Sequence, residues 1–203
     1  MSPSAPEKRF SDPVVALDIG NVSMRLTFDE MYRRLDADPA DSGAVARLWE
    51  HGAALETGRC TVPEFLDRLD ALTGHRHTRQ ELLEGWRCGV REPMPGMQDT
   101  VRELAARGVR FSFLSDISPI HLEQVFRYCE FVHFVSGGVY SFEAGAFKLD
   151  GCAMFEAFER RYGRPIAFFD DRIEIIRHAR ELGWNAIRFE SAEQVLHDAG
   201  ALL

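Results

Sequence analysis

Apolar runs that end abruptly in acidic or hydroxyl residues mark the positions of this sequence that could do chemistry. The first run, Val14–Leu17, is followed by Asp18, Ile19, Gly20 and Asn21. A carboxylate at the carboxyl end of a buried strand lies where open α/β sheets bind ligands. Asp18 could equally cap a turn, because Asp side chains bond to nearby backbone groups. On this segment alone, both interpretations stay open.

A second run, Phe111–Leu114, ends in Ser115 and Asp116. Ser118 followed by Pro119 is typical of an N-cap and the first residue of a helix. Backbone donors and the helix dipole make such a helix start a natural anion site. Ser115 is therefore a candidate anion ligand, although an ordinary turn hydroxyl would give the same pattern.

Two adjacent carboxylates, Asp170 and Asp171, follow a third run, Ile166–Phe169. If they share a sheet edge with Asp18, their mutual repulsion would be relieved by a divalent cation. Ligands that are all oxygen favour magnesium. The alternative for either residue is capping of the helix that follows.

Lysine is rare in this chain, since of 24 basic residues only Lys8 and Lys148 are lysine. A lysine at position 148, in a loop before a helix, suggests that a compact ammonium with three donors is needed there and a planar guanidinium would not serve. Such a charge could bridge a carboxylate and an anionic substrate. A solvated surface lysine is the competing interpretation.

The elements that would position these residues form an α/β pattern. Apolar runs without alternation are typical of parallel strands covered by helices on both faces, so we predict a Rossmann-like, doubly wound sheet. The five predicted strands are Val14–Leu17, Val109–Leu114, Phe131–Val135, Ile166–Phe169 and Asn185–Phe189. The predicted core helices are Met97–Ala106, Pro119–Tyr128, Gly151–Tyr162, Glu174–Leu182 and Ala192–His197.

Roughly 80 residues without a convincing strand separate the first two runs, far more than an ordinary connection needs. Helical spacing of apolar residues there predicts an inserted helical cap, with Pro93–Gly96 as the hinge back to the core. We therefore predict a flexible N-terminus over 1–12, a catalytic core over 13–22 and 93–203, and a cap over 23–92. The predicted cap helices are Phe28–Leu35, Val45–His51, Pro63–Leu72 and Gln80–Trp86.

Composition limits the partners. The 203 residues, 45% apolar and 28% charged, suit a globular core with one insertion. A net charge of −8 without a basic run argues against nucleic acid. No run approaches the roughly 20 apolar residues of a membrane span, and the polar Met1–Phe10 lacks a signal-peptide pattern. The four scattered cysteines suggest neither zinc nor disulfides. We expect a cytoplasmic protein with a small-molecule partner and leave its oligomeric state open.

Taken together, the order strand-Asp, strand-Ser, loop-Lys, strand-Asp-Asp resembles the four motifs of the haloacid dehalogenase-like (HAD) superfamily and covers nearly the whole chain. Leu17–Val22 looks like the first motif of a phosphatase subgroup related to bacterial sugar-phosphate phosphatases. Ser115–His121 is similar to its second motif, and Glu56–Arg59 followed by Phe65 is similar to its cap.

The resemblance implies hydrolysis of a small phosphomonoester, such as a sugar phosphate. Asp18 would attack phosphorus and form an aspartyl-phosphate that water hydrolyses. Magnesium would be held by the Asp18 carboxylate, the Gly20 carbonyl and Asp171, with Asp170 as a further ligand or beside them. The residues implied to contact the phosphate are Ser115, Asp116, Gly20, Asn21 and Lys148.

The sequence departs from the family pattern at four positions. Many members carry a general acid and base where this chain has Gly20. Asp116 stands where the subgroup has Asn, Leu149 where Pro is usual, and Ile175 where Asn is common. Loss of a positioned acid or base typically lowers the rate by about 10²–10⁴. Asp116 could replace that acid, which is a hypothesis.

These departures keep alternatives open. One is a protein that keeps the fold and binds ligands without turnover. Another is a metal-independent 2-haloacid dehalogenase, which the Asp170-Asp171 pair argues against, and a phosphoglucomutase-like transfer ranks lower because Gly20 is not an acid. The residues interpreted as cap packing or surface are Trp49, His51, Glu56, Arg59 and Trp86, and those interpreted as helix surface are His121 and His178.

Overall fold

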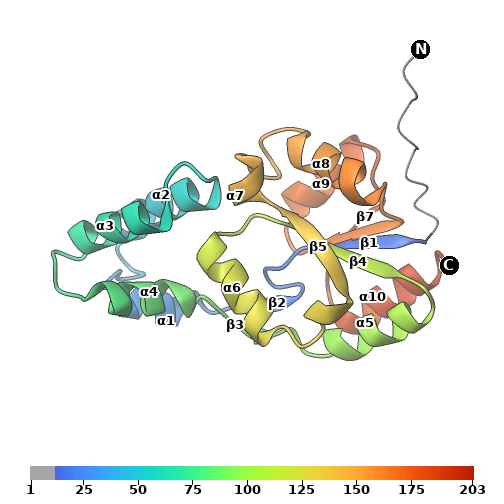
Figure 1. The fold of residues 1–203 in the computed structure, drawn as a ribbon, viewed down its shortest axis with the longest axis horizontal. Helices are drawn as coiled ribbons and strands as arrows, with labels where there is room; N and C mark the ends of the chain where they lie inside the picture. The colour runs from blue at the N-terminus through green and yellow to red at the C-terminus, as the bar shows by residue number, and fades with distance from the viewer. Residues whose placement is uncertain (1–11) are drawn as a thin grey trace, which may run out of the picture.

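The central element of the fold is β1 (Val14–Leu17), which is buried at every position. A computed structural model describes residues 12–203, so the expectation for 1–12 lies outside the described residues except for Asp12. The strand order of the main sheet is β5-β4-β1-β6-β7, and all its pairings are parallel. The Rossmann-like α/β fold is confirmed (Figure 1). The other strands are β4 (Arg110–Ser115), β5 (Val135–Tyr140), β6 (Ala167–Asp170) and β7 (Ala186–Arg188).

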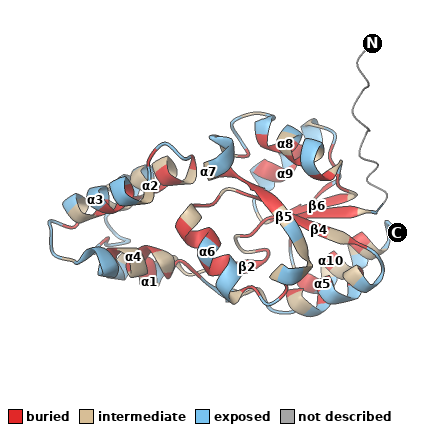
Figure 2. Ribbon diagram, in the orientation of Figure 1, coloured by how far each residue is buried: buried red, intermediate tan, exposed pale blue. Residues whose placement is uncertain are grey.

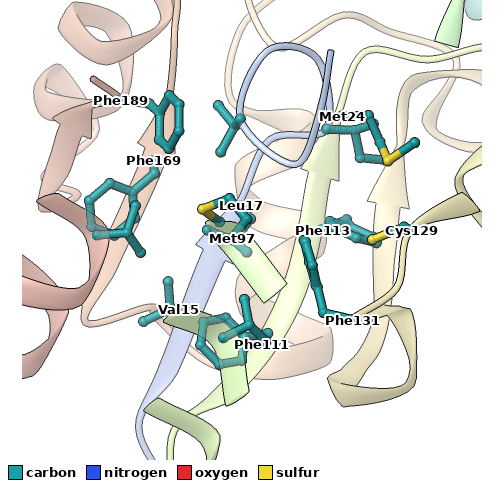
Figure 3. Close-up of a cluster of buried hydrophobic side chains, with 14 of the residues drawn as sticks. Val15, Leu17, Met24, Met97, Phe111, Phe113, Cys129, Phe131, Phe169 and Phe189 are labelled. Carbon is teal, nitrogen blue, oxygen red and sulfur yellow. The ribbon is translucent and has the colours of Figure 1, made fainter. Parts of the chain in front are cut away.

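Helices cover both faces of this sheet, which explains why its strands are apolar throughout. Successive residues of a strand point to opposite faces. Val15 and Leu17 belong to a core cluster on one face, shown in Figure 3, whereas Val14 and Ala16 belong to the cluster on the other. The core helices are α5 (Met97–Ala106), α6 (Pro119–Tyr128), α8 (Ala153–Tyr162), α9 (Ile173–Glu181) and α10 (Ala192–Gly200).

The prediction of a strand over Phe131–Val135 is wrong in its position. Phe131 is fully buried, but it precedes a 3-10 turn, η1 (Val132–Phe134), and the strand begins only at Val135. The strand itself contains Gly137 and Gly138, which break the apolar pattern. An apolar run without periodicity can pack into a core either as a turn or as a strand. The sequence pattern alone therefore did not distinguish a turn from a strand at this position.

Two short strands were also missed. β2 (Met24–Leu26) and β3 (Val90–Pro93) pair antiparallel where the chain leaves the core and where it returns. Three or four residues are too few for a recognisable alternation. The segment Pro93–Gly96 lies at the end of β3, and Gly96 starts α5 with a left-handed φ of 79°.

The chain between β2 and β3 folds into four helices around a hydrophobic cluster of their own. The cluster contains Met31, Leu48, Phe65 and Trp86, all without exposed surface. Figure 1 shows these helices beside the sheet domain, and Figure 2 shows their buried faces turned toward each other. They are α1 (Phe28–Arg34), α2 (Ser42–Glu56), α3 (Val62–Leu72) and α4 (Arg79–Arg87). None of the described helices is long and apolar enough to cross a membrane.

Candidate active site

The site lies at the carboxyl edge of the sheet, because β1, β4 and β6 are parallel and end side by side. Asp18 follows β1, Ser115 ends β4 and Asp170 ends β6. The turn after β1 is tight: Asn21 adopts a left-handed φ of 51°, and Ser23 Oγ donates to the Asp18 carbonyl at 2.8 Å. The turn therefore holds the Asp18 side chain at the strand end.

Lys148 lies at the centre of the site and is 1% exposed. Its Nζ donates to Asp18 Oδ1 at 2.8 Å, to Asp170 Oδ2 at 2.5 Å and to the Leu114 carbonyl at 3.3 Å. Burial alone would lower the pKa of Lys148, but Asp170 and Asp18 outweigh it and raise that pKa. The interpretation as a solvated surface lysine is wrong, and the ammonium stays charged at neutral pH.

Asp18 is itself buried, with 6% of its surface exposed. Burial raises its pKa, Lys148 opposes the rise, and the neighbouring Asp170 adds to it. A hydrogen bond from Ser115 also stabilises the ionised form. The negative charge of the carboxylates in the site therefore exceeds the positive charge of its single ammonium group.

One carboxylate oxygen from each of Asp18, Asp170 and Asp171 lies within 4.8 Å of the other two. An all-oxygen set of this size fits a divalent cation such as magnesium. Asp170 accepts from Lys148 with Oδ2 and from the Arg172 amide with Oδ1 at 2.9 Å, and Asp18 likewise accepts from Lys148 and Ser115. Asp171 is partly exposed and accepts from Asn21 Nδ2 at 3.0 Å. Of the three carboxylates, Asp171 therefore has the most capacity left for a cation.

Asp116 connects two loops. Its Oδ1 accepts from the Lys148 amide at 2.9 Å, and its Oδ2 pairs with Arg172 Nη2 at 2.7 Å. Both carboxyl oxygens of Asp116 therefore act as hydrogen-bond acceptors. The hypothesis that Asp116 serves as the missing acid loses its support, since a proton there would cost one of these bonds.

Arg172 was missed by sequence analysis. It pairs with Asp116, and its amide donates to Asp170. Its position directly after the two aspartates was the available signal, but arginine is the common cation of this chain and gave no contrast.

A cavity of about 590 Å³ opens above the site and extends to the cap. Ser115 and Lys148 line it beside Asp18 on the core side. Trp49 and Glu56 line it from α2, with Phe28 of α1. Its size is that of a site for a small metabolite. Trp49 also packs in the helical cluster, as predicted, against Phe28 and Trp86. The prediction that neither Trp49 nor Glu56 contacts a substrate stays a prediction, although both line the cavity.

Trp86, by contrast, is cap packing as predicted, since it is fully buried against Trp49, Phe65 and His121. Arg59 is exposed and donates to Thr57 Oγ1 at 2.8 Å. His51 and His178 are half-buried and do not line the cavity.

Leu149 and Ile175, two of the four positions at which the sequence departs from the family pattern, lie in different surroundings. Leu149 is 46% exposed and lines the cavity. Ile175 is fully buried in the core, which explains an apolar residue at that position.

The interpretation of His121 as a helix-surface residue is wrong, because His121 is only 3% exposed. Its Nε2 donates to the Trp86 carbonyl at 2.7 Å, and its ring stacks on the Trp86 ring at 5.1 Å between centroids. Burial lowers the pKa of His121 to about 4, and the hydrogen bond to Trp86 opposes this only in part. Helices α6 and α4 thus meet through a neutral imidazole.

Replacing His121 with phenylalanine is expected to change the pH dependence of stability. The pKa of His121 falls from 6.5 to about 4 on folding, so the unfolded chain binds more protons between these values. The wild type therefore loses stability as the pH falls through this window, by up to about 3 kcal/mol at roughly 1.4 kcal/mol per pH unit. The variant lacks this loss. Urea unfolding of both proteins at several pH values measures the difference between their free energies of unfolding. Carboxyl groups present in both proteins contribute equally and cancel from this difference. A difference that stays constant over the window would contradict a neutral His121.

Comparison with known proteins gives a consistent fold assignment. No protein-family model matches the chain, and no curated protein does. A HAD family enzyme from Bacteroides thetaiotaomicron has a TM-score of 0.77 at 19% identity, covering 89% of this chain and 94% of that one. The same enzyme in complex with magnesium and inorganic phosphate gives a TM-score of 0.76 at 16% identity, covering 89% and 96%. A HAD-like hydrolase from Porphyromonas gingivalis gives 0.75 at 19% identity, covering 94% and 97%. The chain therefore has the fold of HAD family enzymes.

Proposed function

We propose that this protein is a magnesium-dependent phosphohydrolase of the HAD family that cleaves a small phosphomonoester, with Asp18 as the nucleophile. The observation that carries the proposal is the buried Asp18–Lys148–Asp170 network beside Asp171, which faces a cavity of metabolite size. The magnesium and inorganic phosphate bound by a HAD family enzyme of the same fold support the choice of metal and of phosphorus as the reacting atom.

The ligands that we propose for magnesium are the Asp18 carboxylate, the Gly20 carbonyl and Asp171, with Asp170 holding Lys148 in place. When bound, the cation neutralises charge on the phosphoryl oxygens. Asn21 supports the ligand set through its bond to Asp171. The carboxylate excess of the site matches this need, because one ammonium cannot balance three carboxylates and a phosphate.

This chain's own residues would then act in two steps. Asp18 attacks phosphorus as the bond to the leaving oxygen breaks, and water afterwards displaces Asp18 from the phosphoryl group. Ser115 and Lys148 hold the phosphoryl oxygens, and Asp116 fixes the Lys148 loop through its bond to the Lys148 amide. Since Asp170 also binds Lys148, the ammonium stays oriented while Asp18 reacts.

A sugar phosphate is the substrate class that we propose. The cap side of the cavity combines the rings of Trp49 and Phe28 with the polar group of Glu56. Aromatic faces can pack against the apolar side of a sugar ring, while a few polar groups set its orientation.

The Asp18→Asn variant is expected to lose phosphate release by about 10⁴-fold or more, because the amide is a poor nucleophile and a poor metal ligand. The measurement is release of inorganic phosphate from a panel of sugar and nucleotide monophosphates, with magnesium and with a chelator. Asp99→Asn, at an 81% exposed side chain of α5, is the matched control and should retain full activity.

Two outcomes would contradict this function. Phosphate release that survives Asp18→Asn would remove the nucleophile. Binding of magnesium and phosphate by the wild type, without release of phosphate from any ester, would instead indicate a ligand-binding protein, an alternative motivated by Gly20. Halide release from a haloacid in the presence of chelator would indicate a dehalogenase.

A further inference from the structure

Hydrolysis of an ester with a poor leaving group needs a proton at the leaving oxygen, and the core of this site provides no evident donor. Position 20 is glycine. Lys148 is committed to Asp18 and Asp170, and Asp116 accepts hydrogen bonds with both oxygens. Two further acidic residues line the cavity from the core: Asp171 is a proposed metal ligand, and Asp150 accepts from the Phe147 amide at 2.9 Å. Among the described residues, the acidic group of the lining that has no such role lies on the side formed by α1 and α2.

Glu56 is the acidic side chain on that side. It is the last residue of α2 and lines the same cavity as Asp18, Ser115 and Lys148. The carboxyl group is half-buried, and it has no hydrogen bond or ion pair with any described side chain or backbone group. A carboxyl group that lines the cavity without a partner is free to bond to a substrate.

The backbone beside Glu56 is held firmly against the core. The next residue, Thr57, is 5% exposed and donates from Oγ1 to the Ala53 carbonyl at 2.7 Å. Gly58 follows with a left-handed φ of 64°, and a Cβ there would lie 2.4 Å from the Phe142 carbonyl oxygen. Figure 1 shows this end of α2 directed toward α7 (Ser141–Ala144) of the core. Contact with the core thus fixes where Glu56 enters the cavity.

The surroundings of Glu56 move the pKa of its carboxyl group close to neutral pH. Burial raises its pKa to about 7, and the nearby Asp116 adds to the rise, while Arg172 opposes it. Asp18 and Lys148 line the same cavity. A carboxyl group with a pKa near the working pH can both donate and accept a proton in one catalytic cycle.

We propose that Glu56 is the general acid and base of this enzyme, in place of the aspartate that Gly20 replaces. The inference rests on the proposed phosphohydrolase function. In the first step, Asp18 Oδ forms a bond to phosphorus, the bond from phosphorus to the leaving oxygen breaks, and that oxygen takes the proton of Glu56. In the second step, the Glu56 carboxylate takes a proton from water as the water oxygen bonds to phosphorus and the Asp18–phosphorus bond breaks. Both carboxyl groups return to their starting states.

The experiment compares two esters of nearly equal shape, phenyl phosphate and p-nitrophenyl phosphate, in the wild type and in Glu56→Gln. Phenolate is a poor leaving group, whereas p-nitrophenolate departs without a proton. We expect kcat/KM for phenyl phosphate to fall by about 10²-fold or more, the usual loss for a positioned acid. For p-nitrophenyl phosphate it should change by less than about 3-fold, since bond breaking to this group gains little from acid catalysis.

Glu50→Gln is the matched control, because Glu50 belongs to the same helix, is exposed and does not line the cavity. It should leave both esters unaffected. The pH profile adds a second readout: wild-type kcat/KM for phenyl phosphate should fall above about pH 7, where Glu56 loses its proton, and Glu56→Gln should lack that descent. Urea unfolding of both variants checks that the fold is retained.

Equal losses on the two esters in Glu56→Gln would overturn the inference and assign Glu56 to substrate binding. Unchanged rates on both would overturn it as well. The proposed function fails separately: in that case neither ester releases phosphate in a manner that depends on Asp18, and the role of Glu56 falls with it.

Discussion

Replacing Lys148 with methionine is expected to remove both activity and a large part of the stability. Its Nζ is the ion-pair partner of Asp18 and Asp170, and the methionine would leave these buried carboxylates facing each other. Removal of one partner from a buried ion pair typically costs about 3–5 kcal/mol. Loss of a charged donor to the phosphoryl group should lower phosphate release by about 10²–10³-fold or more. Urea unfolding and a phosphate-release assay measure the two effects.

Magnesium should reduce the stability deficit of Lys148→Met, because a divalent cation would take over the charge balance of the three carboxylates. The increase in unfolding free energy on adding magnesium should therefore be larger in the variant than in the wild type. Arg102→Met, at a 56% exposed side chain of α5, is the control for loss of one positive charge. A Lys148→Met protein as stable as this control would show that the network does not hold the site together.

Replacing Trp86 with alanine is expected to destabilise the protein by about 3–5 kcal/mol, the usual range for a buried tryptophan. Its ring has no exposed surface, and it contacts Trp49 and Phe65 edge-on and stacks on His121. Its Nε1 also donates to Ser118 Oγ at 3.3 Å. Because Trp86 joins the helical cluster to α6, the loss should affect both parts. Equilibrium urea unfolding, followed by circular dichroism, measures it.

Phe126→Ala is the control for Trp86→Ala, since Phe126 is a large aromatic side chain that is 55% exposed. It should change stability by about 0.5 kcal/mol or less. A Trp86→Ala effect no larger than that of the control would show that the contact between α4 and α6 contributes little to folding.

The amino-acid sequence could predict the elements whose signals are local. Val14–Leu17 has the same bounds in the structure because a parallel central strand is apolar on both faces. Met97–Ala106 and Pro119–Tyr128 were also predicted to the residue, since amphipathic spacing and the Ser118-Pro119 start are local. Strand β5 was misplaced, because the apolar run before it packs as a turn and the strand itself carries two glycines.

The residues of the candidate site, too, were predictable from the sequence only where their signals are local. The sequence identified four candidate residues by their type and their position at strand ends: Asp18, Ser115, Asp170 and Asp171. Parallel strands end at a common edge of the sheet, and ligands of such sheets bind there. The scarcity of lysine singled out Lys148. These inferences use only the order of residues along the chain and the geometry of a parallel sheet.

The tertiary structure alone decided which groups are engaged and which are free. Asp116 looked like a spare acid in the sequence, but its two oxygens are bound to the Lys148 amide and to Arg172, 56 residues further along the chain. Glu56 was interpreted from the sequence as cap packing or surface, yet in the structure it lines the same cavity as Asp18. Hydrogen-bond partners and burial depend on segments far apart in sequence, and these decide whether a carboxyl group is ionised, bound or free to move a proton.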